Sequence, residues 1–375
     1  MHITIETYVL SVLSVIGVFS SWQGVTQGFP SYEGDKVCNV NIVSQPAASI
    51  QRSSSVAPEK VESKLLADGR SLQFKQPRFQ LDQSLQNDPC LKEQWALKQI
   101  QAVQSSHITE SGSQILVAIL DTGIDQDHED LNGRVVDEVN FAESPTTDDV
   151  YGHGTHVAGI ITANSDNNLG IVGLAPESYL LNVKVVDDYG RCDVSALANG
   201  IIWAVKNGAS VINISVELRE SSPRLEDAVD YAWRNGAIVI SAAGNEGSEN
   251  PVYPAYYENC IAVTAIQENG ALAPLSNYGD WVEVAAPGFN IYSTLPNNSY
   301  GYKHGTSFAT AYVSGLAALL FPMVTDINCD GRLNDEVRQV IEAGCREIGI
   351  DGAGKGCINI AKSLVEIASA CESLP

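Results

Sequence analysis

The sequence predicts an α/β protein in which a mostly parallel central sheet carries helices on both faces, giving three layers. Six apolar runs rich in β-forming residues recur along the chain: ILVAIL (115–120), YLLNVKVV (179–186), SVINISV (210–216), AIVISAA (237–243), CIAVTAI (260–266) and VEVAA (282–286). Strands as continuously apolar as these are typical of a parallel sheet with two buried faces. Helical patterns at 193–208 and 222–236 lie between the strands, and each ends on Asn-Gly, a helix stop signal.

The composition indicates a folded chain with a large core. Of the 375 residues, 44% are hydrophobic and 18% are charged, which excludes disorder as the main state. The chain has 22 basic and 45 acidic residues, a formal net charge of −23. This excess of acid argues against nucleic acid as a partner, because phosphate requires a positive surface, and against docking on anionic lipid.

The N-terminal region predicts a targeting segment followed by a loose connection. The run YVLSVLSVIGVFS (8–20) has the length of a signal-peptide hydrophobic region and is too short to span a membrane, so we expect no stable membrane insertion. Glu6 precedes this run where a basic residue is usual, and a buried helix or strand is the alternative interpretation. We assign residues 1–22 to a signal peptide, 23–86, which are rich in Ser, Gln and Pro, to a linker or propeptide, and 87–375 to the folded domain.

The cysteine pattern is compatible with disulfides in an exported chain. Eight cysteines lie at positions 38, 90, 192, 260, 329, 345, 357 and 371, without any C-x-x-C pair, which argues against a zinc ribbon or a thioredoxin motif. The pairing cannot be deduced from spacing. Cleavage near Gln86 would remove Cys38 and leave an odd number, so one thiol would stay free or pair with a partner.

Three segments carry residues suited to catalysis. Asp121 directly follows the first apolar run, and the carboxyl end of a parallel strand is where sites gather. His153 lies in a glycine-rich segment that permits close approach of another backbone, while His156 is expected to be a core histidine rather than a metal ligand. Ser307 begins an apolar helix, whose N–H groups and dipole favour an oxyanion. Singly, a capping Asp, a core His and a capping Ser are simpler interpretations; together they supply acid, base and nucleophile.

Six ordered motifs carry a family resemblance. They are DTGID (121–125), HGTHVAGI (153–160), SAAGNEG (241–247), YPAYY (253–257), VAAPG (284–288) and GTSFAT (305–310). With these motifs the chain resembles the subtilisin-like serine proteases (subtilases), and among them the thermitase-type enzymes, from about residue 87 to 320 and more loosely beyond. The resemblance implies a subtilisin-like three-layer fold, with 87–375 as the peptidase domain, and a serine endopeptidase that forms an acyl-enzyme.

The resemblance also implies a role for each matching residue. Asp121 orients His153, His153 acts as general base and then as general acid, and Ser307 is the nucleophile. Asn245, in the SAAGNEG turn, matches the amide that holds the oxyanion together with the backbone N–H of Ser307.

Two edges of the domain are expected to hold the substrate as an extended strand. The positions that match the family's substrate-binding residues are Gly190, Arg191, Cys192, Ser215, Val216, Glu217, Ala243, Gly244 and Glu246. Glu217 stands where the family usually has a glycine, so its carboxyl group narrows the cleft, attracts basic substrates or simply faces solvent. Tyr312 replaces a usual histidine and is expected to change the helix packing behind the serine.

Calcium is the cofactor that the resemblance implies, at two places. The first set of side-chain and carbonyl oxygens comes from Asp88, Asp130, Asn164, Asn167, Leu169 and Ile171, with a hydrogen-bonded loop without metal as the alternative. The second comprises Asp326, Asn328 and Asp330, in the first half of an EF-hand-like loop. The twelfth position of this loop is Val337 rather than a bidentate glutamate, although Glu336 is adjacent, so a capped acidic loop is an equal alternative.

The sequence therefore predicts a secreted, calcium-stabilised serine endopeptidase, monomeric, that acts on polypeptides and is inhibited by its own propeptide. Two alternatives stay open at this stage. An intracellular processing subtilase follows if residues 8–20 are not a signal, and a catalytically silent binding protein with the same fold is the second, against which the complete set of catalytic residues argues.

Overall fold

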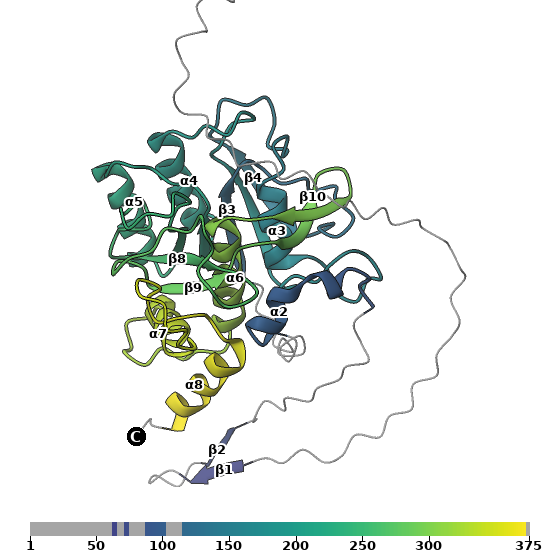
Figure 1. Ribbon diagram of the computed structural model, residues 1–375. Helices are drawn as coiled ribbons and strands as arrows, with labels where there is room; N and C mark the ends of the chain where they lie inside the picture. Colours follow the sequence, from purple (N-terminus) through teal and green to yellow (C-terminus); the bar gives the residue numbers. More distant parts are fainter. Residues whose placement is uncertain (1–61, 66–70, 75–86, 103–114, 373–375) are drawn as a thin grey trace, which may run out of the picture. The chain divides into compact units, whose positions relative to one another are not determined.

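The computed structural model describes residues 62–65, 71–74, 87–102 and 115–372 (Figure 1). The predicted signal peptide, at 1–22, lies outside the described residues, as does most of the segment 23–86. The described part of that segment is an antiparallel hairpin of β1 (Glu62–Leu65) and β2 (Ser71–Phe74). Its two short strands are not predicted by the Ser- and Gln-rich composition around them.

A seven-stranded sheet forms the centre of the domain, and every pairing in it is parallel. Its strands are β3 (Leu116–Asp121), β4 (Val135–Asn140), β5 (Tyr179–Lys184), β6 (Val211–Ile214), β7 (Ile238–Ala242), β8 (Cys260–Ile266) and β9 (Val284–Pro287). Their order across the sheet is β4-β5-β3-β6-β7-β8-β9. The predicted α/β class with a mostly parallel sheet is thus confirmed.

Helices cover both faces of this sheet (Figure 1). On one face α4 (Val194–Lys206) and α5 (Pro223–Arg234) pack together, α4 on β3 and β5 and α5 on β7. On the other face α3 (Gly154–Thr162) packs against α6 (Thr306–Leu320), and α6 contacts β6 to β9. The remaining described elements are η2 (Leu91–Glu93), α2 (Trp95–Gln99), the hairpin β10 (Ile291–Leu295) with β11 (Ser299–Lys303), α7 (Asn334–Ala343) and α8 (Ile360–Glu372).

Successive residues of a strand face opposite cores. In β3, Val117 and Ile119 join the core on the α6 side, whereas Ala118 and Leu120 join the core on the α4 side. Because side chains alternate along a strand, a strand covered on both faces must be apolar at nearly every position. This requirement is the physical origin of the continuous apolar runs in the sequence.

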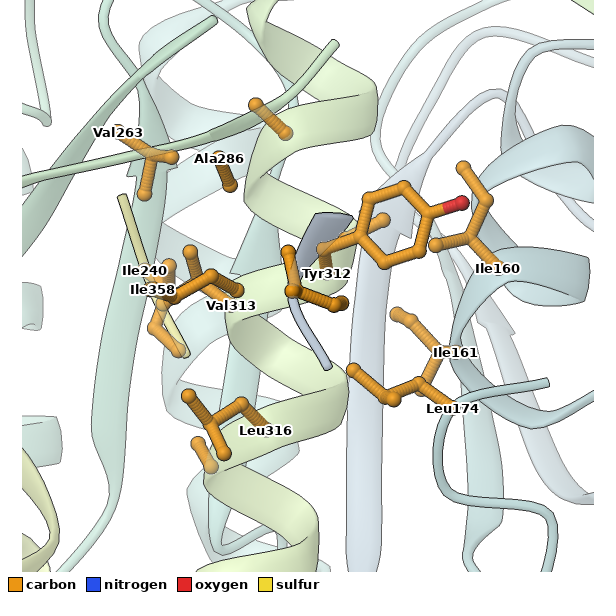
Figure 2. Close-up of a cluster of buried hydrophobic side chains, with 14 of the residues drawn as sticks. Ile160, Ile161, Leu174, Ile240, Val263, Ala286, Tyr312, Val313, Leu316 and Ile358 are labelled. Carbon is orange, nitrogen blue, oxygen red and sulfur yellow. The ribbon is translucent and has the colours of Figure 1, made fainter. Parts of the chain in front are cut away.

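Helix α6 is buried along its whole length. Figure 2 shows the Tyr312 ring directed towards Ile160 and Ile161 of α3, and Val313 on the side of Ile240 and Ile358. Tyr312 is 1% exposed. The replacement at this position therefore fills the packing between α6 and α3, the two helices that begin at the candidate site.

Strand β3 lies where the order of the sheet reverses, with β5 on one side and β6 on the other. A crevice opens at the carboxyl end of the strands at such a point, and ligands of α/β proteins bind there. Asp121 is the last residue of β3. The fold thus places the first of the predicted catalytic residues at this crevice.

Candidate active site

Asp121 and His153 form the centre of the site. His153 lies directly before α3, and its Nδ1 is 2.8 Å from Oδ1 and 3.0 Å from Oδ2 of Asp121. Both side chains are buried. The helix starts this close to the strand because Gly154 has no side chain, since a Cβ there would lie 2.1 Å from the carbonyl oxygen of Gly123. With Nδ1–H donating to the carboxylate, Nε2 of His153 is left as the basic nitrogen.

A second buried carboxylate, Asp149, fastens the two segments that carry this pair. Its Oδ1 accepts hydrogen bonds from the Thr122 hydroxyl at 2.8 Å and from the Gly152 N–H at 2.7 Å. Its Oδ2 accepts from the N–H and the hydroxyl of Thr155, at 2.8 and 2.7 Å. Thr122 in turn accepts from the Gly154 N–H at 3.0 Å. Asp149 thus joins the end of β3 to the start of α3, a role that no sequence motif indicated.

Lys184 supports the same region from β5. The side chain is fully buried, and its Nζ donates to the carbonyl oxygens of Thr122 and Asp148 at 2.6 and 2.8 Å and pairs with Asp188 at 2.7 Å. In the sequence this lysine interrupts an apolar run and does not stand out as part of a site. The supporting role of Lys184 becomes visible only when its hydrogen-bond partners in the structure are known.

Ser307 lies in the first turn of α6, beside Asn245. The backbone N–H of Thr306 donates to Oδ1 of Asn245 at 2.8 Å, and the Thr306 hydroxyl lies 3.2 Å from the same oxygen. With this oxygen engaged, Nδ2 of Asn245 is the end of the amide that can donate to a ligand. Together with the N–H groups of the first turn of α6, it forms a donor set suited to an oxyanion.

The ring of Phe308 lies between the two histidines of the glycine-rich segment. Its centroid is 5.3 Å from that of His153 and 4.5 Å from that of His156. His156 is fully buried, its Nε2 lies 3.2 Å from the carbonyl oxygen of Gly301, and burial holds its pKa well below the ordinary value. His156 is thus a neutral core histidine that packs behind the site.

The first predicted substrate edge is a tight loop after β5. Val186 and Cys192 form an antiparallel bridge, and the Asp187 N–H donates to the carbonyl oxygen of Arg191 at 2.8 Å. Gly190 has a φ of +79°, a conformation that favours glycine. Arg191 pairs with Asp187 at 2.6 Å, while its side chain remains 70% exposed.

The second predicted edge follows β6 and contacts the α6 start. The hydroxyl of Ser215 donates to the carbonyl oxygen of Ser307 at 3.5 Å and accepts from Asn213, which also accepts from Ser314 of α6 at 2.9 Å. The sequence-predicted residues Val216 and Glu217 follow on this edge, and Ala243, Gly244 and Glu246 lie on the loop after β7. The structure thereby brings this edge, the β7 loop and Ser307 together.

Two carboxyl groups of the first predicted calcium set, those of Asp88 and Asp130, hydrogen-bond to the same loop after α3. Asp88 and Asp130 are both buried, at 4% and 0% exposure. Their hydrogen-bond donors are neutral: the N–H groups of Asp166, Asn167 and Ile171, the Asn167 amide and the Tyr300 hydroxyl. Burial, together with the charge of Asp88, raises the pKa of Asp130 to about 6. Two buried carboxyl groups without a cationic side chain fit a hard divalent cation.

Not every member of this set lies equally well for a cation. The Oδ1 of Asn164 accepts from Arg134 at 2.7 Å, which leaves its backbone carbonyl as the donor of interest. The Oδ1 of Asn167 accepts from the Leu169 N–H at 2.8 Å, and its amide nitrogen faces Asp130 at 2.7 Å. Within the described residues, no group of three or more His, Cys, Asp or Glu side chains converges as metal ligands.

The second predicted calcium loop is held by its own hydrogen bonds. Asp326 accepts from the Gly331 N–H at 2.8 Å, and Asn328 accepts from the Asp330 N–H at 2.9 Å. Asp330 is paired with Arg332, so one of the three predicted ligands is already neutralised. Glu336 folds back to accept the N–H of Ile327 at 2.8 Å. A calcium ion in this loop stays a prediction.

The cysteines add no cross-link at five described positions. Cys192, Cys260, Cys329, Cys345 and Cys357 are free thiols. The disulfides that the even cysteine count suggested therefore find no support at these residues.

An α/β fold with a buried Asp–His pair, and with a serine in the first turn of a helix, is the arrangement expected of a serine hydrolase. Comparison with known proteins makes the assignment specific: residues 112–342 match the model of the Subtilase family (Peptidase_S8), and the chain belongs to that family of serine endopeptidases.

Individual relatives agree with this assignment. The chain is 44% identical over 246 residues to the thermophilic serine proteinase of Bacillus sp. (strain AK1), covering 65% of this chain but only 60% of that protein. It is 41% identical over 282 residues to thermitase of Thermoactinomyces vulgaris, covering 74% of this chain and 98% of that protein. Among solved structures, a protease of Pseudoalteromonas arctica PAMC 21717 is similar, with a TM-score of 0.67, 27% identity, and coverage of 76% of this chain and 100% of that one.

Proposed function

We propose that the protein is an exported, calcium-stabilised serine endopeptidase in which Asp121, His153 and Ser307 form the catalytic triad. The observation that carries the proposal is the pair of short contacts, 2.8 and 3.0 Å, from His153 Nδ1 to the Asp121 carboxylate; Ser307 lies in the first turn of α6, whose Phe308 ring packs against the His153 ring. Membership of a family of serine endopeptidases supports the same residues, because they stand in the family's motifs.

In the proposed mechanism the Ser307 oxygen attacks the carbonyl carbon of the scissile peptide bond. His153 Nε2 accepts the serine proton, and the buried Asp121 carboxylate stabilises the imidazolium that forms. The N–H of Ser307 and Nδ2 of Asn245 stabilise the negative oxygen of the tetrahedral intermediate. His153 then gives its proton to the leaving amine, and an acyl-enzyme remains. A water molecule repeats the sequence, with His153 as base, and releases the acid.

Calcium is proposed at the Asp88 and Asp130 cluster. The support is the burial of both carboxyl groups among neutral donors. A bound ion would supply positive charge that compensates the carboxylates of Asp88 and Asp130, which accept N–H groups from the loop after α3. It takes no part in the bond cleavage.

Export and processing complete the proposal. The apolar run at 8–20 supports a signal peptide, and residues 23–86 would then be a propeptide removed near Gln86. No described helix has both the length and the apolarity to cross a membrane. Polypeptides are the proposed substrates, with the propeptide as inhibitor and a monomer as the working form.

One experiment tests activity and processing together. The full chain is expressed with its N-terminal region, and the culture medium and cells are assayed for cleavage of a protein substrate, with Ser307→Ala as the matched control. We expect activity in the medium, none for Ser307→Ala, and a mature N-terminus near residue 87. Activity found only in the cytosol, from uncleaved chain, would replace export by intracellular processing.

A further inference from the structure

Two glutamates, Glu217 and Glu246, meet beside the oxyanion-binding amide. They lie on the loops after β6 and β7, which are neighbouring parallel strands, so both loops leave the same edge of the sheet. Gly244 lies between them: a Cβ on this residue would be 2.7 Å from Oε2 of Glu217 and 3.1 Å from Oε2 of Glu246. Both carboxyl groups therefore lie close to the backbone of Gly244, the residue before Asn245.

The side-chain hydrogen-bond donor and the cation nearest to this pair both contact Glu246. Asn277 donates to Oε2 of Glu246 at 2.9 Å, and the guanidinium of Arg219 is 3.9 Å from its Oε1. In the described part of the chain, Oε2 of Glu217 is buried without a fixed donor. Its near neighbour is the carboxyl group of Glu246, itself an acceptor, so the two can share only a proton. The two carboxyl groups therefore face a single cationic side chain among the described residues, that of the exposed Arg219.

The protonation of the pair agrees with this geometry. Burial, and then the hydrogen bond and charge of Glu246, raise the pKa of Glu217 to about 8. Burial alone would raise the pKa of Glu246. The hydrogen bonds from Glu217 and Asn277 and the charge of Arg219 outweigh burial and hold this pKa below the ordinary value. The charged groups that face Glu217 are Glu246 from the β7 loop and Arg219 from its own loop, and Arg219 is 81% exposed.

We propose that Glu217 and Glu246 form a specificity subsite for a cationic side chain, Lys or Arg, at the residue before the scissile bond. The proposal rests on the proposed function: in that function, Asn245 holds the carbonyl oxygen of the substrate residue before the scissile bond. Its side chain therefore leaves the substrate backbone within a few bonds of Gly244 and the two carboxyl groups. An ammonium or guanidinium group supplies the donors that Oε2 of Glu217 lacks and displaces the shared proton.

The pH dependence follows from that displaced proton. At low pH a cation must displace the proton of Glu217 into solvent, whereas well above its pKa this carboxyl group is already ionised. The preference for a cationic residue therefore rises with pH, while Lys keeps its own charge up to about pH 10. The preference for a neutral side chain of the same length should change in the opposite sense.

Two fluorogenic peptides that differ only in Lys or norleucine before the cut test the subsite. We expect the ratio of kcat/KM for Lys over norleucine to exceed about ten and to rise between about pH 6.5 and about pH 9. Glu217→Gln, and separately Glu217→Gly, should lower this ratio roughly tenfold. The control Glu220→Gln removes an exposed carboxylate of the same loop and should leave the ratio unchanged. A wild-type ratio near one, unaltered in the Glu217 variants, would overturn the proposal.

A binding experiment separates the subsite from the triad. The Ser307→Ala protein is titrated with p-aminobenzamidine, an arylamidine cation whose fluorescence changes on binding, so no catalysis is needed. We expect saturable binding that weakens at least about tenfold in the Ser307→Ala, Glu217→Gln double variant. Equal binding by both proteins contradicts the subsite. If the peptides are not cleaved but the amidine result holds, the catalytic proposal fails and the subsite stands.

Discussion

The side-chain oxygen of Asn245 accepts a 2.8 Å hydrogen bond from the N–H of Thr306, the residue that precedes the proposed nucleophile Ser307. This contact fixes the amide so that Nδ2 is the donating end. We predict that Asn245→Ala lowers kcat by about 10²–10³ with a smaller change in KM, because the donor acts on the charge of the transition state. Asn250→Ala, at an exposed position of the same loop, is the control. Steady-state kinetics that show less than about a threefold loss for Asn245→Ala would remove its assigned role.

Asp149 is predicted to position the triad without touching substrate. Its carboxylate accepts four hydrogen bonds from three residues of the β3 and α3 ends. Asp149→Ala leaves buried donors without acceptors, so we expect a loss of about 2–4 kcal/mol in the free energy of unfolding. In the folded variant, kcat should fall more than KM changes. Asp148→Asn, at the exposed neighbouring position, should alter neither; equal effects at the two positions would show that Asp149 has no special role.

We predict that Glu283 makes the free energy of unfolding depend on pH. Burial raises the pKa of this carboxyl group to about 7, although Ala262 N–H and Arg338 contact it. Between the ordinary value of 4.5 and about 7, the folded state holds more protons than the unfolded state, so stability falls as pH rises through this window.

Glu283→Gln removes that loss of stability. In the Ser307→Ala background, which prevents self-digestion, we expect the stability of the variant relative to its parent to rise by about 3 kcal/mol between pH 4.5 and pH 8. Urea unfolding at several pH values measures this difference, with the exposed Glu347→Gln as control. A difference that does not change with pH would contradict the shift.

Calcium removal is expected to lower thermal stability. An ion present at about 100 times its Kd adds about 2.7 kcal/mol, which corresponds to roughly 4–5 °C in Tm for a domain that spans residues 87–375. Asp130→Asn should abolish the difference between calcium and chelator, and the exposed Asp227→Asn should preserve it. If Asp326→Asn abolishes it instead, calcium binds at the 326–330 loop and not at Asp130. These melts also use the Ser307→Ala background.

Much of the fold could be predicted because parallel strands with two buried faces must be apolar almost throughout. The strand β4 lacked this signal, since Asp137 and Glu138 lie on an edge strand that has no fully buried residue. The catalytic candidates could be predicted from the sequence because Asp121, His153 and Ser307 stand in ordered motifs with chemical roles that complement one another.

The supporting residues could not be predicted from the sequence in the same way. Asp149 lies in an acidic loop and Lys184 in an apolar run, and the role of each exists only through contacts with residues far along the chain, such as Thr155 and Thr122. The sequence showed Glu217 as a departure from the family pattern, but it left open whether the carboxyl group faces the cleft or solvent. Its carboxyl group lies against Gly244 because the β6 and β7 loops meet, which is a consequence of tertiary structure.

Reaction of Ser307 with a fluorophosphonate probe is the most direct test of the central claim, since the probe reacts only with a serine activated by a base and stabilised as an oxyanion. We predict stoichiometric labelling of the mature protein, located at Ser307 by peptide mass spectrometry, abolished in Ser307→Ala and strongly reduced in His153→Ala. A folded, mature protein that remains unlabelled, or that labels equally after Ser307→Ala, would contradict the assignment of a working triad.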